Sequence, residues 1–445
     1  MADGERVTPR VTAAWVFVLV VVVLVGAAAL LVPWGSARSA TGSITPDATL
    51  DFSAAEIALG DRLARLLVVP GLTSMGVSLG LTLVLGLTPL GARIASAVAR
   101  PLGGGWFWQA SLGGLLLLLI VRLATLPFGA WAESVRRSNG LSTRTWPGWA
   151  LDVAKGFGVS ALLTLVALTA LIGLARRWPD WWWVAGGLGA ALLVVTVSFA
   201  YPLVVEPLFN SFTPMPDGAL RTSLLALAEE DGVTVDDVLV ADASRRTSTL
   251  NAYVSGFGSS RRIVVYDNLL EQAPDAEVEA VVAHELGHAA DRDVVTGTVL
   301  GALGAMAVVV LLYLVSGWLP LERWFGISGI GDGRSMAFLL AFVAVISFVS
   351  TPVQSEVSRQ LEARADQHAL DLTKDPQTFA EMQRRLATAS KSDVTPNRAL
   401  TWWFGTHPTA AARLAAARAW ALTHPGVIAP GPLAPDRVTD VTGEG

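Results

Sequence analysis

The sequence contains no cysteine among its 445 residues. A thiol nucleophile, a cysteine-bound metal and a disulfide are therefore excluded. Charge is scarce as well, because only 16% of the residues are charged while 52% are hydrophobic. The net charge of −5 gives no reason to expect nucleic acid as a partner, which would require a clustered basic surface. This balance is typical of a membrane protein rather than of several soluble domains.

Long stretches without a charged side chain are the first feature that the sequence does contain. Six of them reach the roughly 20 residues that a helix needs to cross a bilayer core of about 30 Å. A seventh carries only Arg122, which either faces a wet cavity or snorkels near a helix end. We therefore expect seven membrane-spanning helices, within residues 11–37, 66–92, 106–128, 156–175, 181–205, 294–321 and 335–355.

The polar segments predict the domain boundaries. Residues 1–205 would form a membrane region with five spans and an amphipathic linker, and the tail at 426–445 would be disordered. Residues 206–293 and 356–425 are expected to be two halves of one compact domain, separated by two spans within 294–355. In the first half, the patterns predict helices at 220–230 and 275–293, strands at 235–240 and 263–266, and a strand with a hairpin at 249–260.

The clearest functional motif is His284-Glu285-Leu286-Gly287-His288. Residues four apart share one face of a helix, so both imidazoles can reach a single tetrahedral ion, with Zn–N distances of about 2.0 to 2.1 Å. Glu285 would lie beside the metal, where a general base takes a proton from the attacking water. The motif therefore predicts a Zn²⁺ site with a built-in base.

A catalytic zinc takes three protein ligands and leaves one position for water, so a third ligand must come from elsewhere. An acidic segment follows the last span, and four of its residues remain open as ligands: Glu356, Glu362, Asp366 and His368. Glu362 and Asp366 share a helical face, so one could bind the metal while the other supports a histidine. Asp291 and Asp293 either orient a ligand imidazole or are surface acids at a helix end.

At this point the chain resembles the CAAX prenyl protease 1 family of integral membrane zinc peptidases and their bacterial relatives. The resemblance extends from about Phe52 to Arg413. It rests on Asn139–Thr143 with Trp146 and Trp149, Pro207–Asn210 with Phe212–Pro214, Asn251–Tyr253, Ile263–Asp267, Ser358–Arg359 with Glu362 and Asp366, and His407–Pro408 with Arg413. The implied fold is mostly α, with about seven membrane helices around a chamber and a zincin-like α+β metallopeptidase domain split by two spans.

The resemblance also implies roles for single residues. Glu362 would be the third zinc ligand, and Asp366 would hold a histidine ligand in place. Asn251 would bind the substrate backbone on an edge strand. His407 and Arg413 would stabilise the oxyanion of the tetrahedral intermediate, a task that suits their hydrogen-bond donors. Without the resemblance, His407 would be interpreted as a loop histidine and Arg413 as a surface charge.

Asp293 marks a departure from part of the family. Some members place a histidine five residues after the second zinc histidine, whereas this chain has Asp293, as in the shorter HtpX-type membrane peptidases. The implied partners are the lipid bilayer and a peptide or protein substrate, prenylated or not. The implied role is CAAX-type processing or the clearance of membrane proteins.

The charged residues indicate on which side of the membrane the split domain lies, and they disfavour one of two alternative functions. Arg292, Arg359 and Arg364 lie near span ends on the side of the split domain, which favours placing this domain in the cytoplasm. We expect the membrane itself to be a bacterial cell membrane. An intramembrane protease of the site-2 type is disfavoured, because residues 276–293 carry too many charges for a lipid-exposed segment. A rival from another class is a channel or transporter that holds a structural zinc.

Overall fold

The computed structural model describes residues 3–435. The predicted disorder of the tail lies outside the described residues from residue 436 onward. Before that point the tail follows the surface of the domain, where the Arg418 guanidinium donates a hydrogen bond to the carbonyl of Pro430 at 3.0 Å. The backbone N–H of Ala434 also bonds the carbonyl of Leu50 at 3.1 Å.

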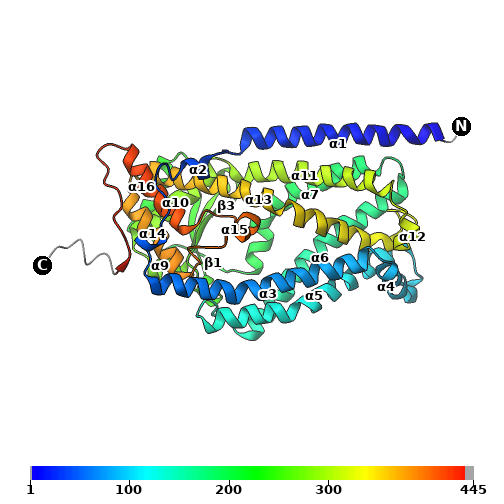
Figure 1. The fold of residues 1–445 in the computed structure, drawn as a ribbon, viewed down its shortest axis with the longest axis horizontal. Helices are drawn as coiled ribbons and strands as arrows, with labels where there is room; N and C mark the ends of the chain where they lie inside the picture. The colour runs from blue at the N-terminus through cyan, green and yellow to red at the C-terminus, as the bar shows by residue number, and fades with distance from the viewer. Residues whose placement is uncertain (1–2, 436–445) are drawn as a thin grey trace.

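Seven helices of the described chain are long and apolar enough to cross a membrane, which confirms the predicted number of spans. They are α1 (Asp3–Leu31), α3 (Ala54–Gly86), α5 (Trp106–Ser138), α6 (Trp146–Arg177), α7 (Trp182–Ala200), α11 (Asp293–Ser316) and α13 (Met336–Thr373). Figure 1 shows these helices lying along the longest axis of the molecule, with the two chain termini at opposite ends. Helix α11 packs between α1 and α7, while α3 packs against α5 and α13.

The second span ends earlier than its apolar stretch predicts. Helix α3 stops at Gly86, and a separate helix, α4 (Pro89–Ala99), begins after a break. Thr88 caps α4 by accepting a hydrogen bond from the N–H of Leu90, and Pro89 fits the first helical position because it has no N–H to leave unpaired. Gly86 permits a close contact with α13, since a Cβ there would lie 2.4 Å from the carbonyl oxygen of Ala337.

A small sheet forms the centre of the split domain, by which we mean residues 206–293 and 356–425. Its strands are β1 (Phe212–Pro214), β2 (Asp237–Ala241), β3 (Ala252–Ser255) and β4 (Arg262–Tyr266), in the order β1-β2-β4-β3. Strands β2 and β4 are parallel, and the two outer strands run antiparallel to their neighbours. Strand β3 is therefore an edge strand. The predicted hairpin is the β3–β4 pair, whose turn contains Gly256 at φ 90°.

Helices cover the sheet and complete the domain. They are α8 (Ala219–Glu230), α9 (Asp267–Gln272), α10 (Asp275–Ala290), α14 (Pro376–Ala389), α15 (Arg398–Phe404) and α16 (Ala410–Thr423); two further short helices, α2 (Ser36–Ser39) and α12 (Leu321–Phe325), lie outside it. One core joins both halves, because Val265 of β4, Val282 of α10 and Phe379 of α14 are fully buried in the same cluster. Each such side chain contributes about 1.5 to 3 kcal/mol when it leaves water.

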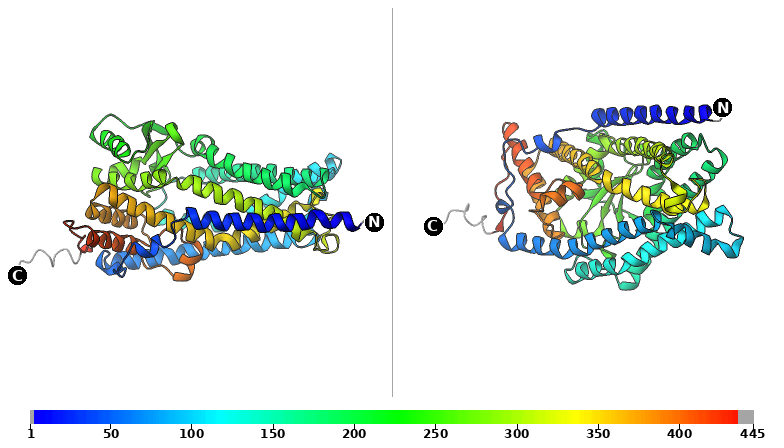
Figure 2. Two further views of the ribbon diagram at one scale, coloured as in Figure 1. Left: turned by 90° about the horizontal axis from the view of Figure 1, so that it is seen from above. Right: turned by 45° about the vertical axis from the view of Figure 1, so that its right-hand side comes forward.

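The split domain and the membrane region are continuous through α13. This single helix of 38 residues begins among the membrane helices and ends beside α10, so no break separates span from domain. Figure 1 and Figure 2 show the strands and α10 gathered at the end of the molecule that also holds α16. The proposed boundary between residues 355 and 356 thus lies inside a helix.

Two connecting segments also join the membrane region to the split domain. In the linker before α3, the Asp51 carboxylate pairs with Arg418 of α16. In the loop between α5 and α6, the hydroxyl of Thr143 donates to the carbonyl of Ser244 at 2.7 Å. This loop belongs to the motif that begins at Asn139, so the motif has a structural position at the junction of the two regions.

Candidate metal centre

Helix α10 holds its histidines in a fixed position because most of its surface is buried. Val282 and Leu286, which flank His284 along the helix, are completely inaccessible to solvent. Near the start of the helix, the buried Glu277 pairs with Arg385 of α14 at 2.5 Å. Its negative charge near the helix N-terminus is also favourable for the helix dipole.

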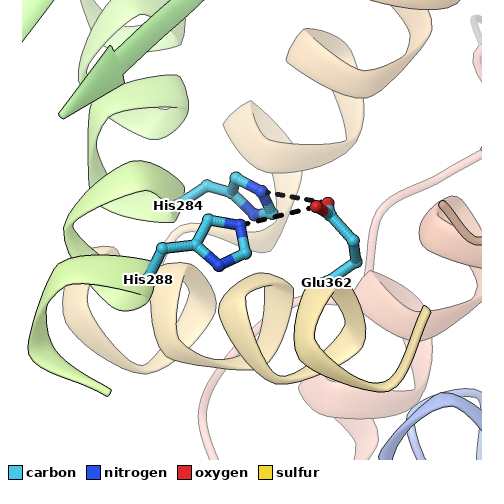
Figure 3. Close-up of side chains that lie close together, drawn as sticks. All are labelled: His284, His288 and Glu362. Carbon is cyan, nitrogen blue, oxygen red and sulfur yellow. Dashed lines mark ion pairs between the residues drawn. The ribbon is translucent and has the colours of Figure 1, made fainter. Parts of the chain in front are cut away.

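His284, His288 and Glu362 converge on one point (Figure 3). Helix α13 brings Glu362 from the second half of the domain to face α10. The Nε2 atom of His284 lies 3.4 Å from Oε2 of Glu362, and Nε2 of His288 lies 3.6 Å from Oε1. Each residue offers one ligand atom within 4.8 Å of the other two.

These separations fit a tetrahedral metal ion. An ion at 2.0 to 2.1 Å from each ligand keeps neighbouring ligand atoms about 3.3 to 3.4 Å apart. The distances of 3.4 and 3.6 Å between Glu362 and the two imidazoles are close to that value. In addition, Oε2 of Glu362 is buried and has no hydrogen-bond partner among the described residues. An unpaired carboxylate oxygen between two imidazoles is the arrangement that a cation would satisfy.

His284 is held from behind by a buried ion pair. Its Nδ1 atom lies 3.0 Å from Oδ1 of Asp366, one turn beyond Glu362 on α13. Asp366 in turn accepts two hydrogen bonds from Arg413 of α16, one of them from Nε at 2.8 Å. Burial alone lowers the pKa of His284, but the neighbouring carboxylates of Asp366 and Glu362 outweigh burial and raise that pKa to about 9.

His288 is held in the same way at the other end of the motif. Its Nδ1 atom lies 2.7 Å from Oδ2 of Asp293, and Arg364 of α13 pairs with the same carboxylate. The local fold explains the reach of Asp293. Arg292 adopts a left-handed conformation at φ 57°, which ends α10 and starts α11, so the chain turns back towards His288.

Glu285 is placed beside the ligands in a cavity of about 460 Å³. Burial raises the pKa of Glu285, while the neighbouring imidazoles oppose that rise. His407 also lines the cavity, with Nε2 at 3.3 Å from Oε1 of Glu362, and its side chain remains 58% exposed. Asn251 and Arg413 line the same cavity. All the residues that the sequence placed in contact with metal or substrate therefore meet in one space.

The other candidate ligands lie elsewhere. Glu356 is paired with Arg359 on its own helix. The Nε2 atom of His368 lies 2.7 Å from Oδ1 of Asp231, the residue that follows α8. Asp291 pairs with Arg364 at 2.8 Å rather than with an imidazole. Of the four residues that the sequence left open as the third ligand, Glu362 is the one that faces both histidines.

Two residues near the site were not identified from the sequence as part of it. Arg364 was considered only for its charge near a span end, but it contacts the carboxylate that holds His288. Gln383 of α14 lines the cavity, and its Nε2 is buried without a hydrogen-bond partner among the described residues. The ion pair of Arg364 requires α11 and α13 to be side by side, and Gln383 belongs to no motif. Neither feature leaves a signal in a single sequence.

Comparisons with known proteins agree with this geometry. The sequence model of peptidase family M48 matches residues 214–421, and the model described as CAAX prenyl protease N-terminal, five membrane helices, matches residues 62–211. The uncharacterized metalloprotease YhfN of Bacillus subtilis is 30% identical over 67% of this chain and 71% of its own length. The CAAX prenyl protease 1 homolog of Oryza sativa is 31% identical over 66% and 70% of the two chains.

The fold is also shared with a solved structure. The crystal structure of Ste24p from S. mikatae superposes with a TM-score of 0.74 and covers 91% of this chain and 98% of its own, at 21% identity. The predicted fold class, a mostly helical membrane protein with a chamber and a small sheet-containing domain, is thereby confirmed.

Proposed function

The chain belongs to peptidase family M48 together with the CAAX prenyl protease 1 enzymes, and from this premise we propose that His284, His288 and Glu362 hold a catalytic zinc ion. Membership confirms the resemblance found in the sequence, and it makes the chain a multi-pass membrane metalloendopeptidase. The observation that carries the zinc proposal is the convergence of three ligand atoms within 4.8 Å.

Zinc is the metal that suits this donor set. Two imidazole nitrogens and one carboxylate oxygen are a ligand combination of catalytic zinc sites, in which a fourth position is open to water. When bound, the ion supplies Lewis-acid chemistry, which polarises a carbonyl group and makes water acidic enough to lose a proton near neutral pH. Asp366 and Asp293 would fix the two imidazoles so that each presents Nε2 to the ion.

The residues around the metal would divide the proton transfers and the charge stabilisation. The Glu285 carboxylate takes a proton from the attacking water and passes it to the nitrogen of the leaving amine. Arg413 uses Nε and one terminal nitrogen on Asp366, which leaves Nη1 to donate to the substrate carbonyl oxygen as negative charge develops. His407 would donate to the same oxygen from the exposed side of the cavity.

The substrate would bind as an extended strand. Strand β3 has no partner on its outer edge among the described residues, and Asn251 at its start lines the cavity. A peptide can add to such an edge through backbone hydrogen bonds. The unpaired Nε2 of Gln383 would provide a further donor for a peptide carbonyl. We expect peptide or protein substrates, with CAAX-type prenylated proteins among them.

A comparison of the parental protein with Glu285→Gln tests this function. Both would be assayed on a peptide with a CAAX-type C-terminus, farnesylated and unmodified, and their zinc content would be measured. Glu285→Gln should keep its zinc and lose about 10² to 10⁴ of the rate, because it removes the base but no ligand. Glu279→Gln makes the same chemical change on the same helix and should keep the parental rate.

The outcomes separate the competing functions. Hydrolysis of the farnesylated peptide alone would support CAAX-type processing, whereas equal hydrolysis of both peptides would support general proteolysis in the membrane. Stoichiometric zinc without hydrolysis of either peptide would favour the alternative function, a channel or transporter that holds a structural zinc. That alternative is not favoured, because its zinc would need four protein ligands, whereas one group of three is found in the described chain.

We also propose that the split domain faces the cytoplasm. Because the chain has no cysteine, single cysteines can be introduced without background labelling. Asp217→Cys lies in the split domain, where the Asp217 side chain is fully exposed, and Arg100→Cys lies in the exposed segment after α4 at the opposite end. In intact cells, a membrane-impermeant maleimide should label the cysteine at 100 and not the one at 217. The reverse pattern would contradict the proposal.

A further inference from the structure

Arg122 lines a second cavity, deep among the membrane helices. This cavity has a volume of about 380 Å³ and lies between α3, α5, α6 and α13. Its size is within the range of about 300 to 1,000 Å³ that is usual for small-molecule sites. Arg122 is the only ionisable residue in its lining. Neither the metal centre nor the proposed substrate strand uses this space, because the two cavities share no residue.

The Arg122 guanidinium has no hydrogen-bond or ion-pair partner among the side chains that the structure describes. Its Nε atom is buried without a hydrogen bond, and no carboxylate from Arg10 to residue 435 forms an ion pair with it. Snorkelling to the membrane surface does not give the guanidinium a polar partner either. Arg122 lies sixteen residues from each end of α5, about 24 Å at 1.5 Å per residue. Helical side chains lean towards the helix N-terminus, so the guanidinium points away from the end at Ser138 and deeper into the membrane region.

Four hydroxyl groups on α3 and α6 line the same cavity as the guanidinium. Ser78 and Thr82 are four residues apart on α3, and Ser160 and Thr164 are four apart on α6, so each pair presents its hydroxyls on one helical face. Within the described chain none of these four hydroxyls has a hydrogen-bond partner. The cavity therefore offers a guanidinium and four hydroxyl donors, and no carboxylate to compete for them.

Thr125 also lines the cavity, but its hydroxyl donates to the carbonyl of Val121 on its own helix at 3.0 Å. The rest of the lining is apolar. It consists of Leu85 on α3, Leu117, Leu118 and Val121 on α5, Phe157 and Ala161 on α6, and Ala337, Leu340, Val343 and Ala344 on α13. An inorganic anion would satisfy Arg122 but would leave these walls against water. A neutral lipid would cover the walls but would leave an uncompensated charge inside the membrane, which is costly. A ligand that satisfies both needs an anionic head and an aliphatic chain.

We propose that this cavity binds a single-chain anionic amphiphile, whose phosphate or carboxylate head pairs with Arg122 while its chain lies along α13. The planar guanidinium suits both heads, because each can accept two parallel hydrogen bonds from it. The hydroxyls of α3 and α6 complete the contacts to the head. The site goes beyond the proposed peptidase function and is independent of zinc.

Binding of radiolabelled dodecyl phosphate to the detergent-purified full chain tests the proposal. The parental protein should bind about one dodecyl phosphate per chain in excess of Arg122→Met. A hydrogen bond to a charged group accounts for about 10- to 150-fold in affinity, so Arg122→Met should weaken binding at least tenfold. Arg122→Lys keeps the charge without the two-pronged geometry and should weaken binding less. Arg100→Met removes an exposed arginine outside the cavity and should bind like the parental protein.

Competing ligands and a second variant test whether dodecyl phosphate binding depends on both the anionic head and the cavity. Dodecanoate should compete with dodecyl phosphate, whereas dodecanol and inorganic phosphate should each compete at least tenfold more weakly. Arg122 has no ion-pair partner among the described side chains, so its replacement by methionine breaks no ion pair and is not expected to unfold the chain. The variant Ser160→Ala with Thr164→Val should also weaken dodecyl phosphate binding, without any change of charge. Equal binding by Arg122→Met and the parental protein, or equal competition by dodecanol, would overturn the proposal.

Discussion

The two histidines of the proposed metal centre are held by the same kinds of side chain in different surroundings. We call His284, Asp366 and Arg413 the inner arm of the centre. Their side chains are 9%, 3% and 12% exposed. In the outer arm, formed by His288, Asp293 and Arg364, these values are 22%, 8% and 26%.

The difference in burial predicts that the loss of an ion-pair partner costs more free energy in the inner arm than in the outer arm. The loss of one partner of a buried ion pair leaves a charge that water cannot reach, whereas near the surface water takes over part of the contact. Each arm joins three helices, which are α10, α13 and α16 in the inner arm and α10, α11 and α13 in the outer arm. In the outer arm, however, the carboxylate is only five residues from its histidine along the chain. We therefore expect the inner arm to contribute to zinc affinity and to folding, and the outer arm mainly to zinc affinity.

We expect the largest loss of zinc affinity from a substitution of Glu362, the residue that faces both histidines. Glu362→Ala removes the ligand that both imidazoles face, so both arms should lose their common ion. Because the loss of a residue that only supports a ligand weakens metal affinity by about 10- to 100-fold, the loss of a ligand should weaken it by more than about 100-fold. Glu356→Ala, six residues earlier on the same helix, should keep its zinc. Measurement of zinc after dialysis against a chelator of known affinity distinguishes the two, and normal zinc in Glu362→Ala would remove the proposed centre.

A pair of matched variants tests the arms against each other. Asp366→Asn should weaken zinc affinity by about 100-fold and Asp293→Asn by about tenfold, the two ends of the usual range for residues that orient a ligand. Asp366→Asn should also lower the midpoint of thermal unfolding in the metal-free protein, because Arg413 then lacks its buried counter-charge. A larger loss of zinc affinity in Asp293→Asn would reverse the proposed ranking of the arms.

The sequence predicted the parts of this centre that depend on local spacing. His284, Glu285 and His288 follow from helical geometry, and the seven spans follow from long apolar runs. From spacing alone the third ligand stayed open among four residues, because the answer depends on which face of α13 meets α10. The family resemblance selected Glu362, and the structure places that residue opposite both histidines.

Features that depend on packing between distant segments could not be predicted in this way. At the end of α3, Gly86 lies so close to Ala337 of α13 that a Cβ would be 2.4 Å from its carbonyl oxygen, and these residues are far apart in the sequence. The ion pair of Arg364 with Asp293 links residues 71 positions apart. For Arg122, the sequence left a wet cavity and snorkelling both open, and the direction of α5 together with the cavity lining favours the cavity.

The smallest expected effect concerns Arg364, the least buried member of either arm. Its contact with Asp293 resembles the ion pairs near a surface that contribute up to about 1 kcal/mol, so Arg364→Gln should weaken zinc affinity by about three- to fivefold. If Arg364 acts only through Asp293, adding Arg364→Gln to Asp293→Asn should cost almost nothing more, because the arginine then has no carboxylate to hold. Zinc affinities of the two single variants and the double variant measure this coupling. Full additivity would show that Arg364 supports the centre by another route, such as its contact with Asp291, and the outer arm would then end at its carboxylate.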